Sequence, residues 1–123
     1  MKKYIDKQTV STYLNLGKTI EVFLGRISND KSIICYLDIV RTKDTDIELT
    51  YYEVYDEGNL EFLDLYSFSS VDPDMDFETY RFDHIDRVIE FIHERFKVTE
   101  IKFVNAGIIQ NEYEDLLISE GRS

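Results

Sequence analysis

Two aspartates fall inside predicted strands, where an acid can be carried into a protein interior. Asp38 shares one face of its predicted strand with Tyr36, and Asp64 shares one face of another with Tyr66. A carboxylate among aromatic side chains loses hydration, which raises its pKa and suits it to accept a proton from a substrate. If those faces line a cavity, the two acids predict a small-molecule pocket. If the opposite faces are buried, both acids lie in water.

A second group of acids has the alternate spacing of a calcium-binding loop. Carboxylate oxygens at alternate positions can converge on one hard cation. The sixth position, where such a loop needs glycine for its sharp turn, is Phe77, and the acid at the twelfth position, Asp83, is also well placed to cap a helix. The competing interpretation is a solvated acidic loop, and the carboxylates concerned are Asp72, Asp74 and Asp76.

Neither the histidines nor the cysteine predicts a catalytic centre. His84 and His93 lie on one predicted helix at a spacing that projects them from opposite flanks, because each residue turns a helix by about 100°. Cys35 lies within an apolar run and is expected to be a buried thiol rather than a nucleophile. The chain has no serine–histidine–acid set, glycine-rich phosphate loop or paired-cysteine motif. We therefore expect no catalytic residue and no cofactor.

The chain has nine tyrosines and no tryptophan. Tyrosine favours strands through side-chain packing. It also dominates protein-binding surfaces, because a rigid ring with one hydroxyl gives much contact at small entropic cost. A sheet that carries tyrosines and is rimmed by acids would suit a basic protein partner. The tyrosines concerned are Tyr36, Tyr51, Tyr52, Tyr55 and Tyr66.

Hydrophobic periodicity predicts an α+β domain that positions these side chains. A first helix is expected over Lys7–Leu16, with Asp6 as its cap. A second helix is expected from the cap Asp83 to about Phe96, and a third over Gln110–Ser119. Polar segment 69–81 is expected to be irregular. Strands are expected over Thr19–Ile27, Ser32–Arg41, Asp46–Tyr55 and Leu60–Phe68, with a fifth over Glu100–Val104.

The short polar turns between the first four predicted strands indicate a four-stranded antiparallel meander. We expect the fifth strand to extend this sheet and the helices to pack on one face of it. A cystatin-like or NTF2-like arrangement is compatible with this order of elements, which does not by itself select it.

The 123 residues are expected to form one domain, residues 1–123. The net charge is −11, and residues 44–94 hold sixteen acidic but only two basic residues, whereas residues 1–43 are net basic. This surplus of acids excludes general nucleic-acid binders, whose phosphate contacts require lysine and arginine. The apolar runs are far shorter than a membrane helix of roughly 20 residues. With one cysteine and no signal-peptide pattern, a cytoplasmic protein that does not bind membranes is expected.

Two stretches of the second half resemble a small family of cyanobacterial proteins of unknown function. One is Phe62–Phe68 followed by Asp72-Pro73-Asp74, and the other is Phe103–Tyr113. This resemblance implies no activity, cofactor or catalytic residue.

These features favour a non-enzymatic binding protein, of adaptor or inhibitor type, whose acidic middle contacts a basic protein partner. The alternative is a small-molecule-binding protein, or a lyase or isomerase on a cystatin-like or NTF2-like scaffold, that uses Asp38 or Asp64. Burial of these carboxylates in an apolar cavity near Tyr36 or Tyr66 would favour the alternative. A homo-oligomer is compatible with the sequence.

Overall fold

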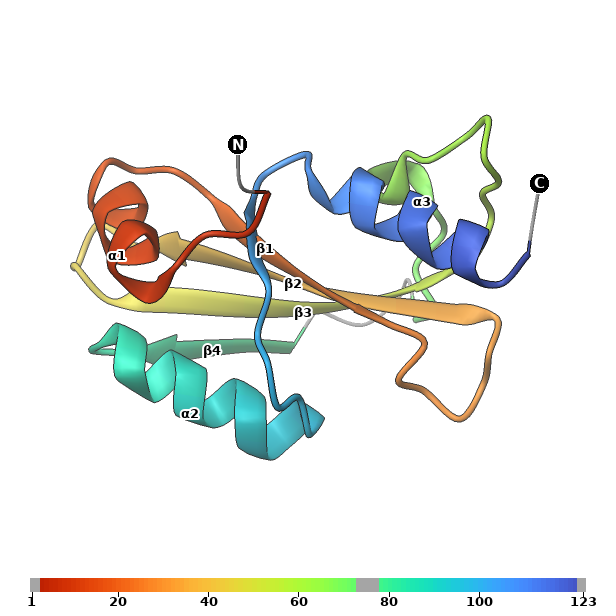
Figure 1. Cartoon of the computed structure of the whole chain (residues 1–123). Coiled ribbons are helices and arrows are strands. Elements are labelled where there is room, and N and C mark those ends of the chain that lie inside the picture. The colour runs from red at the N-terminus through yellow and green to blue at the C-terminus, as the bar shows by residue number, and fades with distance from the viewer. Residues whose placement is uncertain (1–2, 73–77, 122–123) are drawn as a thin grey trace.

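A computed structural model of the chain describes residues 3–72 and 78–121 (Figure 1). It confirms an α+β fold with a five-stranded antiparallel sheet in the order β4-β3-β2-β1-β5. The meander of β1, β2 and β3 lies close to the predicted positions. The strands are β1 (Ile20–Gly25), β2 (Ile33–Arg41), β3 (Ile47–Tyr55), β4 (Glu78–Phe82) and β5 (Phe103–Asn105).

The central strand β2 has apolar side chains on both faces of the sheet. Leu37 and Ile39 point into one hydrophobic cluster, whereas Ile34 and Tyr36 point into another. Since successive side chains of a strand alternate between faces, both faces must be covered. We call the side of Leu37 the first face and the side of Tyr36 the second face.

Helices α1 (Lys7–Asn15) and α2 (Ile85–Phe96) cover the first face. The carboxylate of Asp6 accepts a hydrogen bond from the backbone N–H of Thr9 at 2.8 Å, as predicted for the cap of α1. The predicted cap of α2 is wrong by one residue. Nδ1 of His84, rather than Asp83, accepts a hydrogen bond from the backbone N–H of Asp86.

Helix α3 (Ile109–Ser119) and the irregular segment 56–70 cover part of the second face. Figure 1 shows α3 beside this segment and on the far side of the molecule from α2. The prediction that all helices pack on one face is therefore wrong. Helix α3 packs on the second face because β2 has a second row of apolar side chains, which would be exposed to water without this helix.

The strand predicted over Leu60–Phe68 does not form. Instead, this part of segment 56–70 contains a short 3-10 helix, η1 (Leu65–Ser67), which buries Leu65 and the following Phe68 at a spacing of three residues. The carboxylate of Asp64 accepts a hydrogen bond from the backbone N–H of Tyr66 at 3.2 Å. Such local hydrogen bonds of short polar side chains compete with the pairing of strands.

The fourth strand is β4, within a segment predicted to be irregular. It pairs with β3, and its Tyr80 and Phe82 pack against the core of the first face. Exposed Thr79 and Arg81 alternate with them, so the run appears polar in the sequence although one side of it is apolar. The fifth predicted strand forms over shorter bounds, as β5 beside β1.

An ion-pair network around Arg26 holds segment 56–70 and the end of α3 to the turn after β1. The Arg26 guanidinium donates to the carboxylate of Asp56 at 2.6 Å, to that of Glu120 at 2.7 Å and to the carbonyl of Lys31 at 2.7 Å. Tyr113 donates to the second oxygen of Asp56. Because the side chains of Arg26 and Asp56 are largely buried, loss of one partner would cost about 3–5 kcal/mol.

Gly58 lies where segment 56–70 passes against α3. A Cβ atom at this position would lie 2.5 Å from the carbonyl oxygen of Phe62 and 2.8 Å from the Tyr113 hydroxyl. We expect Gly58→Ala to lower the free energy of unfolding by about 2 kcal/mol, because the overpacked segment must shift. Urea denaturation measures this loss. In the control Glu61→Ala, at an exposed position of the same segment, the change should stay within about 0.5 kcal/mol. Equal stability of both variants would contradict the prediction.

Candidate functional site

A pocket of about 250 Å³ opens on the second face, between β2, β3 and segment 56–70. It lies beside the part of this face that α3 and η1 cover, and aromatic rings form most of its wall. One carboxylate, that of Asp38, belongs to the lining. The lining residues are Tyr36, Asp38, Tyr52, Val54, Tyr66, Phe68 and Ser70.

A second carboxylate, Glu21 of β1, lies next to Asp38 on the neighbouring strand. The two residues face each other in the antiparallel register, so their side chains leave the same face of the sheet. Glu21 is only 3% exposed and Asp38 is half-buried. Within residues 3–72 and 78–121 neither forms an ion pair. Two desolvated carboxylates therefore stand side by side without a cation.

Tyrosine hydroxyls and one backbone amide hold the two carboxylates in place. The Tyr66 hydroxyl donates to the carboxylate of Glu21 and lies 2.7 Å from each of its two oxygens. The backbone N–H of Gly107 donates to Glu21 Oε1 at 3.1 Å. The Tyr52 hydroxyl donates to Asp38 Oδ2 at 2.7 Å. Hydrogen bonds to a carboxylate orient it and lower the cost of its burial, although they add no positive charge.

Burial raises the pKa of both carboxyl groups, and it outweighs the hydrogen bonds that lower these pKa values. The charge of Asp38 raises the pKa of Glu21 further, because a like charge disfavours ionisation. Burial and the neighbouring negative charge of Glu21 also raise the pKa of Tyr36 to about 12. The two neighbouring carboxylates thus give this part of the second face a negative potential.

The three tyrosine rings contact one another in two orientations. Tyr36 and Tyr52 are stacked, with ring centroids 4.8 Å apart and planes at 16°. Tyr36 and Tyr66 meet edge to face at 6.4 Å and 76°. Aromatic faces attract cations through the ring quadrupole. Rings beside carboxylates therefore favour a ligand group that is positively charged and has an apolar periphery.

The structure brings together some of the predicted site residues and separates others. Tyr36, Asp38, Tyr52 and Tyr66 line one pocket. The prediction that Asp64 faces such a pocket from a strand is wrong. Asp64 caps η1, in a segment that is not a strand, and so positions Tyr66 instead.

Tyr51 and Tyr55 do not join this group. Tyr51 lies on the first face, where its hydroxyl donates to Glu53 Oε2 at 2.8 Å and approaches Cys35 Sγ at 3.2 Å. Tyr55 ends β3 and is 39% exposed. The tyrosines predicted to form one surface are thus divided between the faces of the sheet, because odd and even positions of β3 point in opposite directions.

Sequence reasoning missed Glu21 and Gly107. Glu21 alternates with Ile20 and Val22, a pattern that assigns it to the polar side of β1. The available signal was Phe23, two residues along on the same side, because a large aromatic residue there indicates that this face is also covered. Gly107 has a φ of 94°, a conformation that favours glycine, and lies in the turn before α3.

The predicted calcium-binding loop lies mostly outside the described residues, which include neither Asp74 nor Asp76. Asp72 is described and exposed. Across residues 3–72 and 78–121, no three His, Cys, Asp or Glu side chains are grouped so that they could hold a metal ion.

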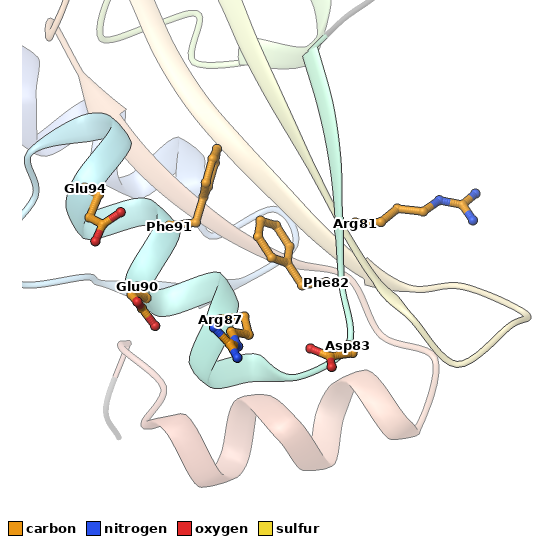
Figure 2. Close-up of a pocket in the computed structure, with 7 residues that line it drawn as sticks. All are labelled: Arg81, Phe82, Asp83, Arg87, Glu90, Phe91 and Glu94. Atoms are coloured by element: carbon orange, nitrogen blue, oxygen red, sulfur yellow. The ribbon is translucent and has the colours of Figure 1, made fainter.

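A second and larger hollow, of about 490 Å³, lies between β4 and α2 (Figure 2). Figure 2 shows the rings of Phe82 of β4 and Phe91 of α2 beside each other, the side chains of Arg87, Glu90 and Glu94 on α2, and Arg81 pointing away from both rings. The charged lining residues are Arg81, Asp83, Arg87, Glu90 and Glu94.

Comparison with protein-family models, with curated proteins and with solved structures finds no match to this chain. None of the helices in the described part of the chain is long and apolar enough to cross a membrane.

Glu21→Gln tests whether the buried charge destabilises the protein. Folding raises the pKa of Glu21. Between the pKa of this group in the unfolded chain and its pKa in the folded protein, the folded state binds more protons than the unfolded chain. The free energy of unfolding therefore falls as the pH rises through this range. We expect Glu21→Gln to raise the melting temperature at neutral pH. It should also reduce the stabilisation that the wild type gains when the pH is lowered from neutrality through the raised pKa of Glu21. Circular dichroism melts across this range measure both effects.

The control for this variant is Glu61→Gln, at an exposed position, which should leave the melting temperature and its pH dependence unchanged. A lower melting temperature of Glu21→Gln at neutral pH would contradict the prediction. It would mean that the hydrogen bonds from Tyr66 and Gly107 outweigh the cost of burying the charge.

Proposed function

We propose that this protein is a non-enzymatic binding protein whose tyrosine–carboxylate pocket receives a cationic group of a basic partner. The observation that carries the proposal is the pair Glu21 and Asp38, two desolvated carboxylates that form no ion pair within the described residues. Buried charges are normally paired, because removal of their hydration is costly. A ligand cation would supply the missing charge.

The size of the pocket supports a ligand group no larger than a side chain. Its volume of about 250 Å³ is below the roughly 300–1,000 Å³ that is usual for drug-sized ligands. An alkylammonium group fits this chemistry, because its charge reaches Asp38 while its methylene groups contact the rings of Tyr36 and Tyr52. The end of a lysine side chain is the commonest group of this kind on a protein surface.

The charge distribution supports a basic partner on a larger scale. Residues 44–94 carry a net charge of −14, from sixteen acidic and two basic residues, and this segment includes Tyr52 and Tyr66. Such a field raises the association rate of positively charged partners and selects against negatively charged ones. A single cysteine cannot form a disulfide within the chain, which agrees with a reducing compartment. We propose that this compartment is the cytoplasm.

A second candidate function is a small-molecule pocket of a lyase or isomerase, with Asp38 as general base. The raised pKa of Asp38 in a tyrosine-lined pocket supports it, because a base with such a pKa takes up a proton more readily near neutral pH. A substrate would have to displace the Tyr52 hydroxyl that donates to this carboxylate. Such a substrate would be an uncharged carbonyl compound rather than a cation.

Titration with N-acetyl-lysine methylamide, followed through the ring resonances of Tyr36, Tyr52 and Tyr66, tests the proposal. We expect the lysine compound and its trimethylated form to shift these resonances, whereas the neutral norleucine analogue should not. Asp38→Asn removes the charge at constant shape and should weaken binding about tenfold. Affinity should also fall as the pH is lowered through the raised pKa of Asp38, because only the carboxylate attracts a cation.

The matched control is Asp44→Asn, an exposed aspartate in the turn between β2 and β3, which should bind like the wild type. Equal binding of the lysine and norleucine compounds would overturn the proposed cation site and favour the small-molecule alternative. Unchanged affinity of Asp38→Asn for the lysine compound would also overturn the proposed cation site, since that site depends on this carboxylate.

A further inference from the structure

The two carboxylates of the site differ in what can reach them. Asp38 belongs to the lining of the tyrosine–carboxylate pocket, whereas Glu21 does not and is almost fully buried. They are direct partners across β1 and β2, a position in which Cβ atoms lie roughly 4.5–5.5 Å apart. A ligand in the pocket therefore contacts Asp38, and Glu21 acts on that ligand only through its charge.

The charged groups that face this pair do not neutralise it. Glu48 of β3 lies diagonally across from Asp38, and its charge adds to burial in raising the pKa of Asp38. Arg81, which β4 places on the same face, has its Nε 3.3 Å from a carboxylate oxygen of Glu48. The ammonium group of Lys102, next to β5, lies 5.3 Å from the centre of the Tyr4 ring. The first proton that such a pair binds is therefore bound more tightly than the second.

Tyrosine hydroxyls pack against the pair from β2, β3 and segment 56–70. Burial, and after it the neighbouring carboxylates, raises the pKa of Tyr36, Tyr52 and Tyr66. Asp64, in segment 56–70, contributes a further negative charge that acts on Tyr36. A decrease in pH from neutrality therefore changes the charge of the carboxyl pair and not that of these tyrosines.

The hydrogen bonds of Glu21 accommodate a proton with the heavy atoms in place. The Tyr66 hydroxyl lies 2.7 Å from each oxygen of Glu21. The backbone N–H of Gly107 donates to Glu21 Oε1 and, at 3.1 Å, also to the hydroxyl oxygen of Tyr66. A phenol hydroxyl can donate or accept. It donates to the carboxylate form of Glu21, and it accepts from the carboxylic acid form when the proton is on Oε2.

We propose that Glu21 acts on the pocket through Asp38: the two carboxylates bind their first proton jointly, and a cation in the pocket expels this proton to the solvent. The inference rests on the proposed function, because the expelling cation is the ligand of that site. The doubly ionised pair attracts an alkylammonium group more strongly than the singly protonated pair, so cation and proton weaken each other's binding by the same factor. Glu21 thereby raises the pH at which the affinity for the cation begins to fall.

Carbon-13 NMR of the full, unliganded chain tests the joint binding of the proton. As the pH is lowered from neutrality, we expect the side-chain carboxyl carbons of Glu21 and Asp38 to change in one shared first step. Asp38→Asn should move the step of Glu21 to lower pH, and Glu21→Gln should do the same to Asp38, because each substitution removes a like charge. The exposed control Asp44→Asn should move neither. Separate steps that neither substitution moves would overturn the inference.

The same titration with a ligand tests the expulsion of the proton and needs only the wild type. The probe is N-acetyl-lysine methylamide at about ten times its dissociation constant for the ionised pair. The midpoint of the first step should then fall by about one pH unit, because the compound binds the ionised pair in preference to the protonated pair. The neutral norleucine analogue should leave the midpoint unchanged.

The outcomes separate this inference from the proposed function. Binding of the lysine compound with an unmoved midpoint would overturn the inference and leave the proposed function standing. Absence of binding at every pH, read from the tyrosine ring resonances, would overturn the proposed function and with it the expulsion by this ligand. The joint first step of the unliganded protein would still be observed in that case.

Discussion

The rest of the structure depends on one constraint, which is that the central strand β2 is apolar on both faces. A strand with Leu37 on one side and Tyr36 on the other must be covered on both faces. Helices α1 and α2 cover the first face, whereas α3 covers only part of the second. Segment 56–70 supplies the remaining cover without forming a strand. The uncovered remainder of the second face is where Asp38 lies half-buried among tyrosines.

The carboxylates on the second face are costly for a domain of this size. Net stabilities of domains are about 5–15 kcal/mol, so a buried charge that lacks a counter-charge is a substantial fraction of the total. Hydrogen bonds from Tyr66 and Gly107 reduce the cost at Glu21 but leave its pKa raised. An amide or an apolar side chain would fit the same space at lower cost. Residues that oppose stability in this way are typical of binding sites, where local destabilisation accompanies function.

The parts of the fold that depend on local patterns could be predicted from the sequence, and the parts that depend on tertiary contacts could not. The Asp6 cap, the apolar stripe of α2 and the strands β1, β2 and β3 follow from side-chain periodicity. Residues 60–68 have the pattern of a strand, yet the side chains of Asn59 and Asp64 accept hydrogen bonds from the backbone of this segment locally. Asp38 and Tyr36 could be found because they share a strand face. Glu21 could not, because its burial comes from Tyr66 and Gly107, which lie 45 and 86 residues away in the chain.

The network around Arg26 has a consequence for the order in which the molecule assembles. Its ion pairs join residues 30 and 94 positions apart, whereas the hairpin of β2 and β3 forms between neighbours in the chain. Contacts of long sequence separation require large loops to close and so form late. During synthesis, segment 56–70 leaves the ribosome well before Tyr113, whose hydroxyl donates to Asp56, and until then the segment lacks one of its anchors. The aromatic wall of the pocket is therefore among the last parts of the molecule to become fixed, after most of the sheet that supports it.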